Sequence, residues 1–479
     1  MNVGTLIDRN VKELPRHTHL TIGEMSWSNN ELLALAGALA TELDRARVVP
    51  GDRVVTVLPV SEWAVVANAA IQRLGAVAVP LDPFLAKPEI DAIVAECAPK
   101  VVLTPDKLPG ENFTWLPGPA PREVDENAPA LIAYTSGTTG RPKGIVLSHR
   151  NLLSQVPEAL RAQPLAMFAA LSGGGGASLI PVPLTHMYGI TLVNLGWFAP
   201  LELVVQPRFD VHAALAAVEK HKVRYFNGVP TIYARILREA GIEKQYDLSS
   251  VWVWLSGTAP LPRAIADEWT VRFGAHIQEG YGLSEAAAGV AAQFPGMAHK
   301  VGSIGVPIPG VEVRVIDDKG RELPRGEVGE LVVRGPTVMK GYYGEDKLTA
   351  ETIRDGWLYT GDLVTQDDEG YLFVVGRKKD LIIRGGLNVY PTEVESCLLT
   401  HAAVMDAAVV GVDDADLGER VKAFVVLRDG ATATGDELRA HCAEKIAKYK
   451  VPEAWAFLGE LPRNAVGKVL KRELKLWTK

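Results

Sequence analysis

Residues 132–149 read IAYTSGTTGRPKGIVLSH, an apolar run that breaks into a polar loop and then returns to Ile-Val-Leu. The loop holds four Ser/Thr hydroxyls, three glycines, Arg141 and Lys143. Glycines let the backbone turn its N–H groups toward an anion, and the hydroxyls and cations add donors and positive charge. The pattern favours a loop that binds a polyphosphate.

This loop differs from the Walker phosphate loop, which requires Gly-x4-Gly-Lys-Ser/Thr at the start of a helix. Counted from Gly137, Pro142 occupies the position of the second glycine, and Lys143 is followed by Gly144 instead of a hydroxyl residue. Gly, Ser and Thr also dominate turns that bind nothing. The segment alone therefore leaves the ligand open.

Length and composition limit the class of protein. A chain of 479 residues exceeds one ordinary core, so we expect two or more domains of unequal size. With 47% hydrophobic and 22% charged residues the chain is globular. Its net charge of -7 argues against a general nucleic-acid binder, which would be basic.

Cysteine usage and the N-terminal sequence indicate the compartment. Cys97, Cys397 and Cys442 are far apart and form no CxxC pair, so the sequence predicts neither a disulfide framework nor a zinc site. Residues 1–15 carry charges where a signal peptide would be apolar, and no window approaches ~20 uninterrupted apolar residues. We expect a reduced, cytoplasmic protein without a membrane span.

The first third of the chain alternates helix-like and strand-like segments. Apolar residues have helical spacing at residues 31–46 and 62–76, and short strand-like runs occur at residues 52–59, 76–80 and 100–105. Such alternation predicts an α/β architecture, with buried parallel strands covered by helices. The pattern recurs between residues 201 and 282, so we expect two related sheet units in a large domain. The SGGGGAS run at 172–178 is interpreted as a loop within it.

The last third shows a different pattern of predicted elements. Residues 302–376 show short strands with turn residues, which predicts a small antiparallel β unit or barrel. The stretch after it has its own strands and a helix at 436–449, enough for a small α+β domain. We place the boundary between a large domain of residues 1–378 and a small mobile domain of residues 379–479. The charged run at 377–380 is a candidate hinge, although such a run is more often a solvated turn.

Five motifs together resemble one known family. The string YTSGTTGRPKG at 134–144 resembles the phosphate-binding loop of the adenylate-forming superfamily, which contains acyl-CoA synthetases, peptide-synthetase adenylation domains and beetle luciferases. Residues 279–285, 359–362, 376–395 and 461–474 resemble its later motifs, in the same order and across nearly the whole chain. The resemblance implies a large domain that binds ATP and the acid, followed by a mobile domain.

The resemblance also implies a set of nucleotide-binding residues. Small residues let the main chain approach a planar ligand, and a tyrosine ring can stack on it. Ser284 stands where the family most often has Thr, and Glu285 resembles the magnesium ligand, since a hard cation prefers oxygen. The implied contacts to ATP are Thr135, Ser136, Gly137, Thr138, Thr139, Gly140, Lys143, Gly257, Thr258, Ala259, Gly280, Tyr281, Gly282, Asp362 and Arg377.

Further roles follow from the same resemblance. Lys468 matches the catalytic lysine, which touches the substrate carboxylate and the α-phosphate, although a lysine this near a C-terminus is usually a solvated charge. Lys379 matches the hinge about which the small domain rotates, and Gly385 and Gly386 match the loop along the thiol tunnel. His186 corresponds to the residue that gates the acyl pocket, with a structural histidine as the alternative.

The implied reaction joins a carboxylic acid to AMP, releases pyrophosphate and then forms a thioester with coenzyme A. Met187 stands where amino-acid-activating members have Asp, and Gly280 where malonate-activating relatives have Arg, so we expect an aliphatic or aryl monocarboxylic acid. An acyl carrier protein is the alternative acceptor, and a luciferase-like monooxygenase or a non-catalytic nucleotide-binding protein are alternative functions. We expect a monomer or homodimer that binds no nucleic acid.

Overall fold

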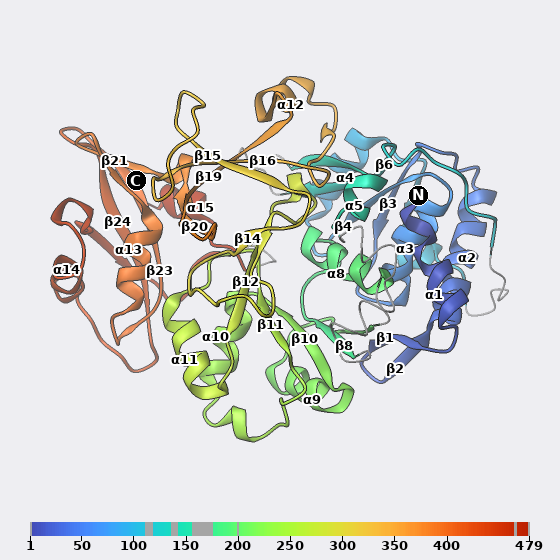
Figure 1. The fold of residues 1–479 in the computed structure, drawn as a ribbon, viewed down its shortest axis with the longest axis horizontal. Helices are drawn as coiled ribbons and strands as arrows, with labels where there is room; N and C mark the ends of the chain where they lie inside the picture. Colours follow the sequence, from blue (N-terminus) through green and yellow to red (C-terminus); the bar gives the residue numbers. More distant parts are fainter. Residues whose placement is uncertain are drawn as a thin grey trace.

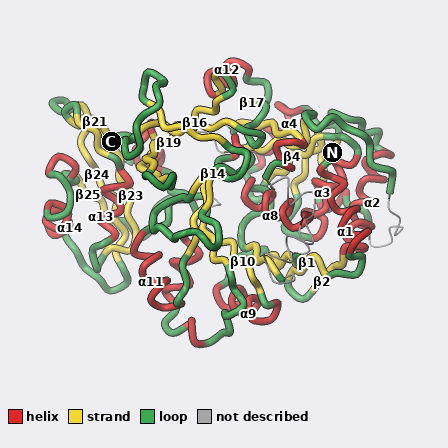
Figure 2. Tube along the Cα trace, in the orientation of Figure 1, coloured by secondary structure: helices red, strands yellow, loops and turns green. Residues whose placement is uncertain are grey.

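The computed structural model describes residues 2–110, 118–135, 142–155, 176–198, 201–463 and 467–477. Within them the strands form four sheets. Two larger sheets and a small β unit precede a compact C-terminal unit, which lies at the opposite end of the molecule from the N-terminal helices (Figure 1). Strands run across the whole width of the molecule, and many of the helices lie at its edges (Figure 2). The α/β architecture that the sequence predicts is confirmed.

The first sheet is built mainly from the first third of the chain, in the order β17-β7-β6-β4-β3-β5. β3 to β6 are parallel, whereas β7 and β17 are antiparallel additions. All five residues of β4 are buried, as expected for a central parallel strand. The strands are β3 (Arg53–Val57), β4 (Val77–Leu81), β5 (Val101–Leu103), β6 (Pro129–Thr135), β7 (Lys143–Ser148) and β17 (Gly341–Tyr342).

The helices of this region begin at clear signals. A capping box precedes α2, in which Ser28 accepts from the Glu31 amide and the Glu31 carboxylate accepts from the Ser28 amide. The bounds are α1 (Leu6–Glu13), α2 (Asn29–Arg45), α3 (Glu62–Arg73), α4 (Lys87–Cys97) and α5 (His149–Leu153).

The second sheet has the order β14-β13-β12-β11-β10-β8-β9-β1-β2 and confirms the predicted repeat of strands and helices. The N-terminal strands β1 and β2 also join it, because β1 pairs in parallel with β9. The strands are β1 (Thr18–Ile22), β2 (Met25–Ser28), β8 (Ala177–Ile180), β9 (Glu202–Val205), β10 (Val223–Gly228), β11 (Val253–Ser256), β12 (Ile277–Tyr281), β13 (Ala291–Ala292) and β14 (Val306–Pro307). The helices are α8 (Met187–Phe198), α9 (Val211–His221), α10 (Pro230–Arg238) and α11 (Arg263–Phe273).

The predicted small β unit is an antiparallel sheet in the order β15-β16-β19-β18, with β20 paired to β19. Its elements are β15 (Glu312–Ile316), β16 (Gly329–Arg334), β18 (Ile353–Arg354), β19 (Trp357–Gln366), β20 (Leu372–Arg377) and α12 (Asp346–Thr352).

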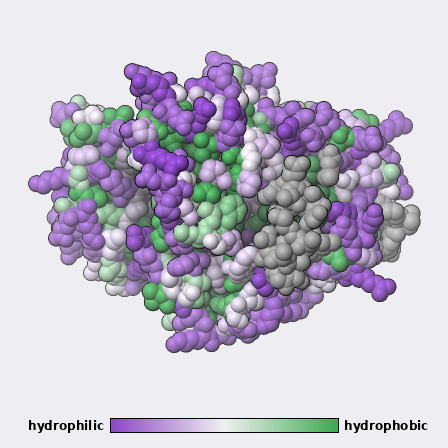
Figure 3. Space-filling model, viewed as in Figure 1, coloured by the Kyte–Doolittle hydropathy of each residue, from purple (hydrophilic) through white to green (hydrophobic). Residues whose placement is uncertain are grey.

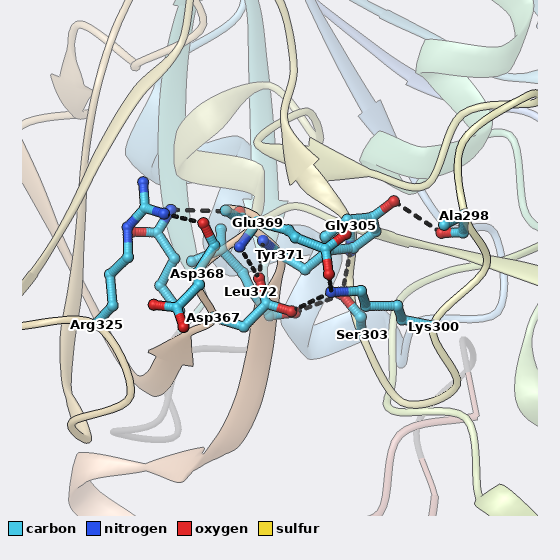
Figure 4. Close-up of polar contacts among 12 residues, drawn as sticks. Ala298, Lys300, Ser303, Gly305, Arg325, Asp367, Asp368, Glu369, Tyr371 and Leu372 are labelled. Atoms are coloured by element: carbon cyan, nitrogen blue, oxygen red, sulfur yellow. Dashed lines mark hydrogen bonds and ion pairs between the residues drawn. The ribbon is translucent and has the colours of Figure 1, made fainter.

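A polar network fastens this unit to the second sheet (Figure 4). Lys300 follows β13 and pairs with Asp367 at 2.5 Å and Glu369 at 2.9 Å, in the β19–β20 turn. The Lys300 ammonium also lies 4.3 Å from the Tyr371 ring centroid, and the Tyr371 hydroxyl donates to the carbonyl of Ala298. These contacts join the connection between β13 and β14 to the β19–β20 turn.

The C-terminal unit has a sheet in the order β22-β21-β24-β23 with β25 beside β24, and it buries residues on both faces. The expected helix at 436–449 is too long: α14 ends at Ala443, and Ala447 is extended, so that Ile446 and Tyr449 both pack on the core. Its elements are β21 (Ile382–Arg384), β22 (Leu387–Val389), β23 (Val404–Asp414), β24 (Gly418–Leu427), β25 (Ala454–Phe457), α13 (Pro391–Leu399), α14 (Gly435–Ala443) and α15 (Lys471–Leu476).

The buried cores follow the same division. Two apolar clusters lie between residues 3 and 372, and two others between residues 382 and 474. The exact boundary at 378/379 remains a prediction. Polar side chains cover most of the visible face of the molecule (Figure 3). Throughout the described ranges, every helix is too short or too polar to cross a lipid bilayer.

Candidate active site

The centre of the site is a buried carboxylate, Asp362, which is 4% exposed. The Tyr281 hydroxyl, at the end of β12, donates to one carboxylate oxygen at 2.5 Å. The Arg377 guanidinium, opposite Asp362 on β20, donates to the other at 2.7 Å. Each carboxylate oxygen can accept a second hydrogen bond, so Asp362 keeps acceptor capacity for a ligand hydroxyl. The structure thus brings three predicted nucleotide contacts together.

Lys468 reaches this cluster from the C-terminal unit. Lys468 is an exposed residue, yet the surrounding protein desolvates its ammonium and, with the charge of Arg377, lowers the pKa of Lys468 to about 8. Asp362 acts in the opposite direction. The preceding residue, Gly467, has a φ of +80° and lies so close to the Thr231 side chain that a β-carbon there would be 3.0 Å from its hydroxyl oxygen.

His186 lies near enough to Lys468 to feel its charge. Its Nδ1 accepts from the Tyr188 amide at 3.2 Å, just before α8 begins. Burial, and secondarily the charge of Lys468, lowers the pKa of His186 to about 4, so the ring is neutral at pH 7. A neutral ring beside Lys468 adds no second positive charge to the site.

Glu285 forms a second cluster with Tyr342 and Lys143. The Tyr342 hydroxyl, on β17, donates to Glu285 Oε1 at 2.9 Å. The Lys143 ammonium lies 5.5 Å from the Tyr342 ring centroid. The described residues contain no group of three or more His, Cys, Asp or Glu side chains that could hold a metal ion. A single carboxylate oxygen fits Mg²⁺ carried by nucleotide phosphates, since Mg²⁺ usually takes only one or two protein carboxylates.

Two tight loops surround Tyr281. Gly282 packs so closely that a β-carbon would lie 2.0 Å from the Ala288 carbonyl oxygen, and Ala288 itself has a φ of +63°. Ser284 opens the short 3-10 turn Ser284–Ala286 in this loop. The amide of Leu261 donates to Glu279 at 3.1 Å, which ties the loop of Gly257, Thr258 and Ala259 to the strand of Gly280 and Tyr281.

The remaining predicted residues lie at the edges of the site. Thr135 ends β6 and pairs with Lys143 at the start of β7. Lys379 stands in the 3-10 turn Lys378–Asp380, and burial lowers its pKa. Gly385 and Gly386 form the exposed turn between β21 and β22. The predicted contacts Ser136, Gly137, Thr138, Thr139 and Gly140 lie outside the described residues.

Three residues of the site were not predicted. Tyr342 holds Glu285 from 57 positions away along the chain, so no local motif contains both. Glu279 is 6% exposed, and burial raises its pKa to about 7. It was missed because the residues that indicated nucleotide binding in its motif are those that follow it. Tyr188 places its hydroxyl in the interior. Tyr188 could have been found from its position two residues after the predicted gating residue His186.

Comparisons with known proteins identify the family of this chain. A family model described as AMP-binding enzyme matches residues 7–343, and one described as AMP-binding enzyme C-terminal domain matches residues 393–468. Feruloyl-CoA synthase of Amycolatopsis sp is 38% identical over 98% of this chain and 97% of its own length. Long-chain-fatty-acid–CoA ligase of Bacillus subtilis is 42% identical over 74% of this chain, which covers only 62% of that ligase.

Solved structures share the overall fold of this chain. ATP-bound MatB from Rhodopseudomonas palustris superposes with a TM-score of 0.91 and 32% identity, over 100% of this chain and 99% of that one. MenE from Bacillus subtilis, in complex with the acyl-adenylate intermediate OSB-AMP, superposes with a TM-score of 0.87 and 30% identity, over 98% of each chain. The sequence relatives are named as CoA ligases or synthases, which is consistent with an AMP-forming acid–thiol ligase. The chain therefore belongs to the AMP-binding enzyme family, within the adenylate-forming superfamily that its motifs resemble.

Proposed function

We propose that the protein activates a carboxylic acid with ATP to an acyl-adenylate, releases pyrophosphate, and transfers the acyl group to coenzyme A. One observation carries the proposal: Lys468, from the C-terminal unit, lies beside Arg377, Asp362 and His186 of the large domain. In this arrangement the cation of Lys468, the proposed ribose acceptor Asp362 and the proposed acyl gate His186 lie close together.

In this reaction the substrate carboxylate attacks the α-phosphorus, and the P–O bond to pyrophosphate breaks. Asp362 holds the ribose, and Tyr281 stacks on the base while its hydroxyl orients Asp362. Lys468 offsets the negative charge that spreads over the carboxylate and the α-phosphate. Mg²⁺ brought by ATP and held at Glu285 would neutralise the departing phosphates. Catalysis then consists of positioning and charge stabilisation.

The proposed acid is a monocarboxylic acid whose tail carries a hydrogen-bonding group. The end of the Tyr188 ring lies beside Gly257, where a β-carbon would be 3.7 Å from the Tyr188 Cζ. The buried hydroxyls of Tyr188 and Ser256 have no hydrogen-bond partner among the described residues. A plain fatty tail would leave them unpaired at a cost of about 1–3 kcal/mol each, so a hydroxylated aryl acid suits this pocket better.

Coenzyme A is the proposed acceptor, because the similar chains are named as CoA ligases and synthases. The small domain would rotate about Lys379 after the adenylate forms, so that Gly385 and Gly386 replace Lys468 at the site. Their exposed turn is free to take part in such a movement. Hinges of this kind need only a few residues.

The test is pyrophosphate release with a panel of matched acids, with and without coenzyme A. The panel pairs cinnamate with hydroxycinnamates and includes octanoate and palmitate. We expect acid-dependent release of pyrophosphate and a thioester when coenzyme A is present, with the hydroxylated aryl acids preferred. A thioester only with a phosphopantetheinylated carrier protein would change the acceptor. No release with any acid would refute the proposed activity.

A further inference from the structure

The ribose-binding turn, residues 360–362, is a bulge in β19. The register between β16 and β19 shifts between Glu330 and Val332, so the turn leaves the regular ladder. Gly361 has a φ of +70°, which favours glycine at the point of the bend. The bulge aims Asp362 at Tyr281 and Arg377. Its shape therefore decides where the ribose acceptor stands.

Two contacts from β16 hold this bulge. The Thr360 hydroxyl donates to the Leu331 carbonyl at 2.7 Å. The amide of Gly361, which the bulge removes from the ladder, donates to Glu330 Oε1 at 3.2 Å. Glu330 is 9% exposed, so its carboxylate is costly to leave without compensation.

The compensating charge comes from the hinge segment. The Lys378 ammonium lies 3.1 Å from Glu330 Oε2, the oxygen that Gly361 does not use. It also lies 2.8 Å from Asp318, but the Asp318 side chain is 89% exposed, and exposed pairs contribute little. Lys378 stands between the ribose contact Arg377 and the proposed hinge residue Lys379. Glu330 is thus shared by the ribose-binding turn and the hinge.

We propose that Glu330 is a positioning residue that couples the hinge segment to the ribose-binding turn. With Lys378 in place, the carboxylate is fixed against Gly361, and Asp362 is held ready for the nucleotide. When Lys378 is lost or displaced, the uncompensated carboxylate turns toward solvent and releases the bulge. Only the effect of this coupling on turnover rests on the proposed function. The coupling itself is measured directly as a change in nucleotide affinity.

The experiment is a double-mutant cycle on the dissociation constant for AMP, measured by calorimetry on the full chain. Lys378→Met lies outside the nucleotide site, yet we expect it to weaken AMP binding about tenfold. Glu330→Gln should weaken it by a similar factor. Because both changes remove the same pair, the double variant should bind AMP about as well as Glu330→Gln alone.

The matched control is Asp318→Asn, which removes the exposed partner of Lys378 and should leave AMP affinity unchanged. Thermal unfolding of each variant checks that the fold persists. If Glu330→Gln fails to fold, Lys378→Met still decides, because wild-type AMP affinity in that variant overturns the coupling. Additive effects in the cycle overturn it as well. Absent pyrophosphate release from the wild-type protein would count against the proposed function alone, since this cycle needs no acid.

Discussion

At the scale of single residues, we expect the ionisation of Lys468 to control the proposed first half-reaction. Its pKa of about 8 means that raising the pH through 8 removes the positive charge that would face the substrate carboxylate and the α-phosphate. We expect kcat/KM for adenylation to fall above about pH 8, since this quantity reports the free enzyme. Lys468→Arg stays charged, so its remaining activity should lack that decline. Equal high-pH limbs in both proteins would contradict the assignment.

The resemblance of the motifs identified some residues of the site but not others, and the reason is physical. Asp362, Arg377 and Lys468 lie inside continuous motifs, so their types and spacing could be recognised. Tyr342 and Glu330 act through contacts between strands that are distant in sequence. No local pattern encodes such a pairing, and only the folded sheet brings the partners together.

At the scale of elements, the two glycines of the EGYGLSE motif have different roles. A β-carbon on Gly282 would overlap the Ala288 carbonyl oxygen at 2.0 Å, whereas one on Gly280 would have its closest contact at 3.7 Å. We expect Gly282→Ala to lower the free energy of unfolding by about 3 kcal/mol, because the loop must shift. Gly280→Ala is the matched control. Urea unfolding of the two variants checks this, and equal stabilities would show that the loop adapts freely.

The order of elements could be predicted where hydrophobic periodicity is local. The β-α-β alternation around β3, β4 and α3 is such a case, and so is the antiparallel texture of β15 and β16. The membership of β1 in the second sheet could not be predicted, because it depends on pairing with β9, about 180 residues later. The end of α14 depended on how Ile446 packs, which is a tertiary effect.

At the scale of the whole molecule, buried histidines make the fold sensitive to acid. His19 is fully buried and stacks on Trp197 with a centroid distance of 4.3 Å, and burial lowers its pKa to about 3. The unfolded chain takes up this proton near pH 6.5 but the folded chain does not, so stability falls as the pH drops below 6.5. Between pH 6.5 and 5 this amounts to about 2 kcal/mol for one such histidine.

His19→Phe keeps the stacked ring and removes the titration. We expect urea unfolding at pH 7.5 and pH 5 to show a smaller loss of stability in this variant than in the wild type. His212→Gln, on an exposed position of α9, is the control and should behave as the wild type does. Parallel losses in the wild type and His19→Phe would mean that other groups govern acid unfolding.

The whole account depends on the small domain carrying Lys468 into a site that belongs to the large domain. The most direct test separates the two half-reactions in Lys468→Ala. We expect adenylation, measured as acid-dependent exchange between ATP and pyrophosphate, to fall at least ~10²- to 10³-fold. Thioester formation from a supplied acyl-adenylate and coenzyme A should remain largely intact. Equal loss of both half-reactions would contradict the account.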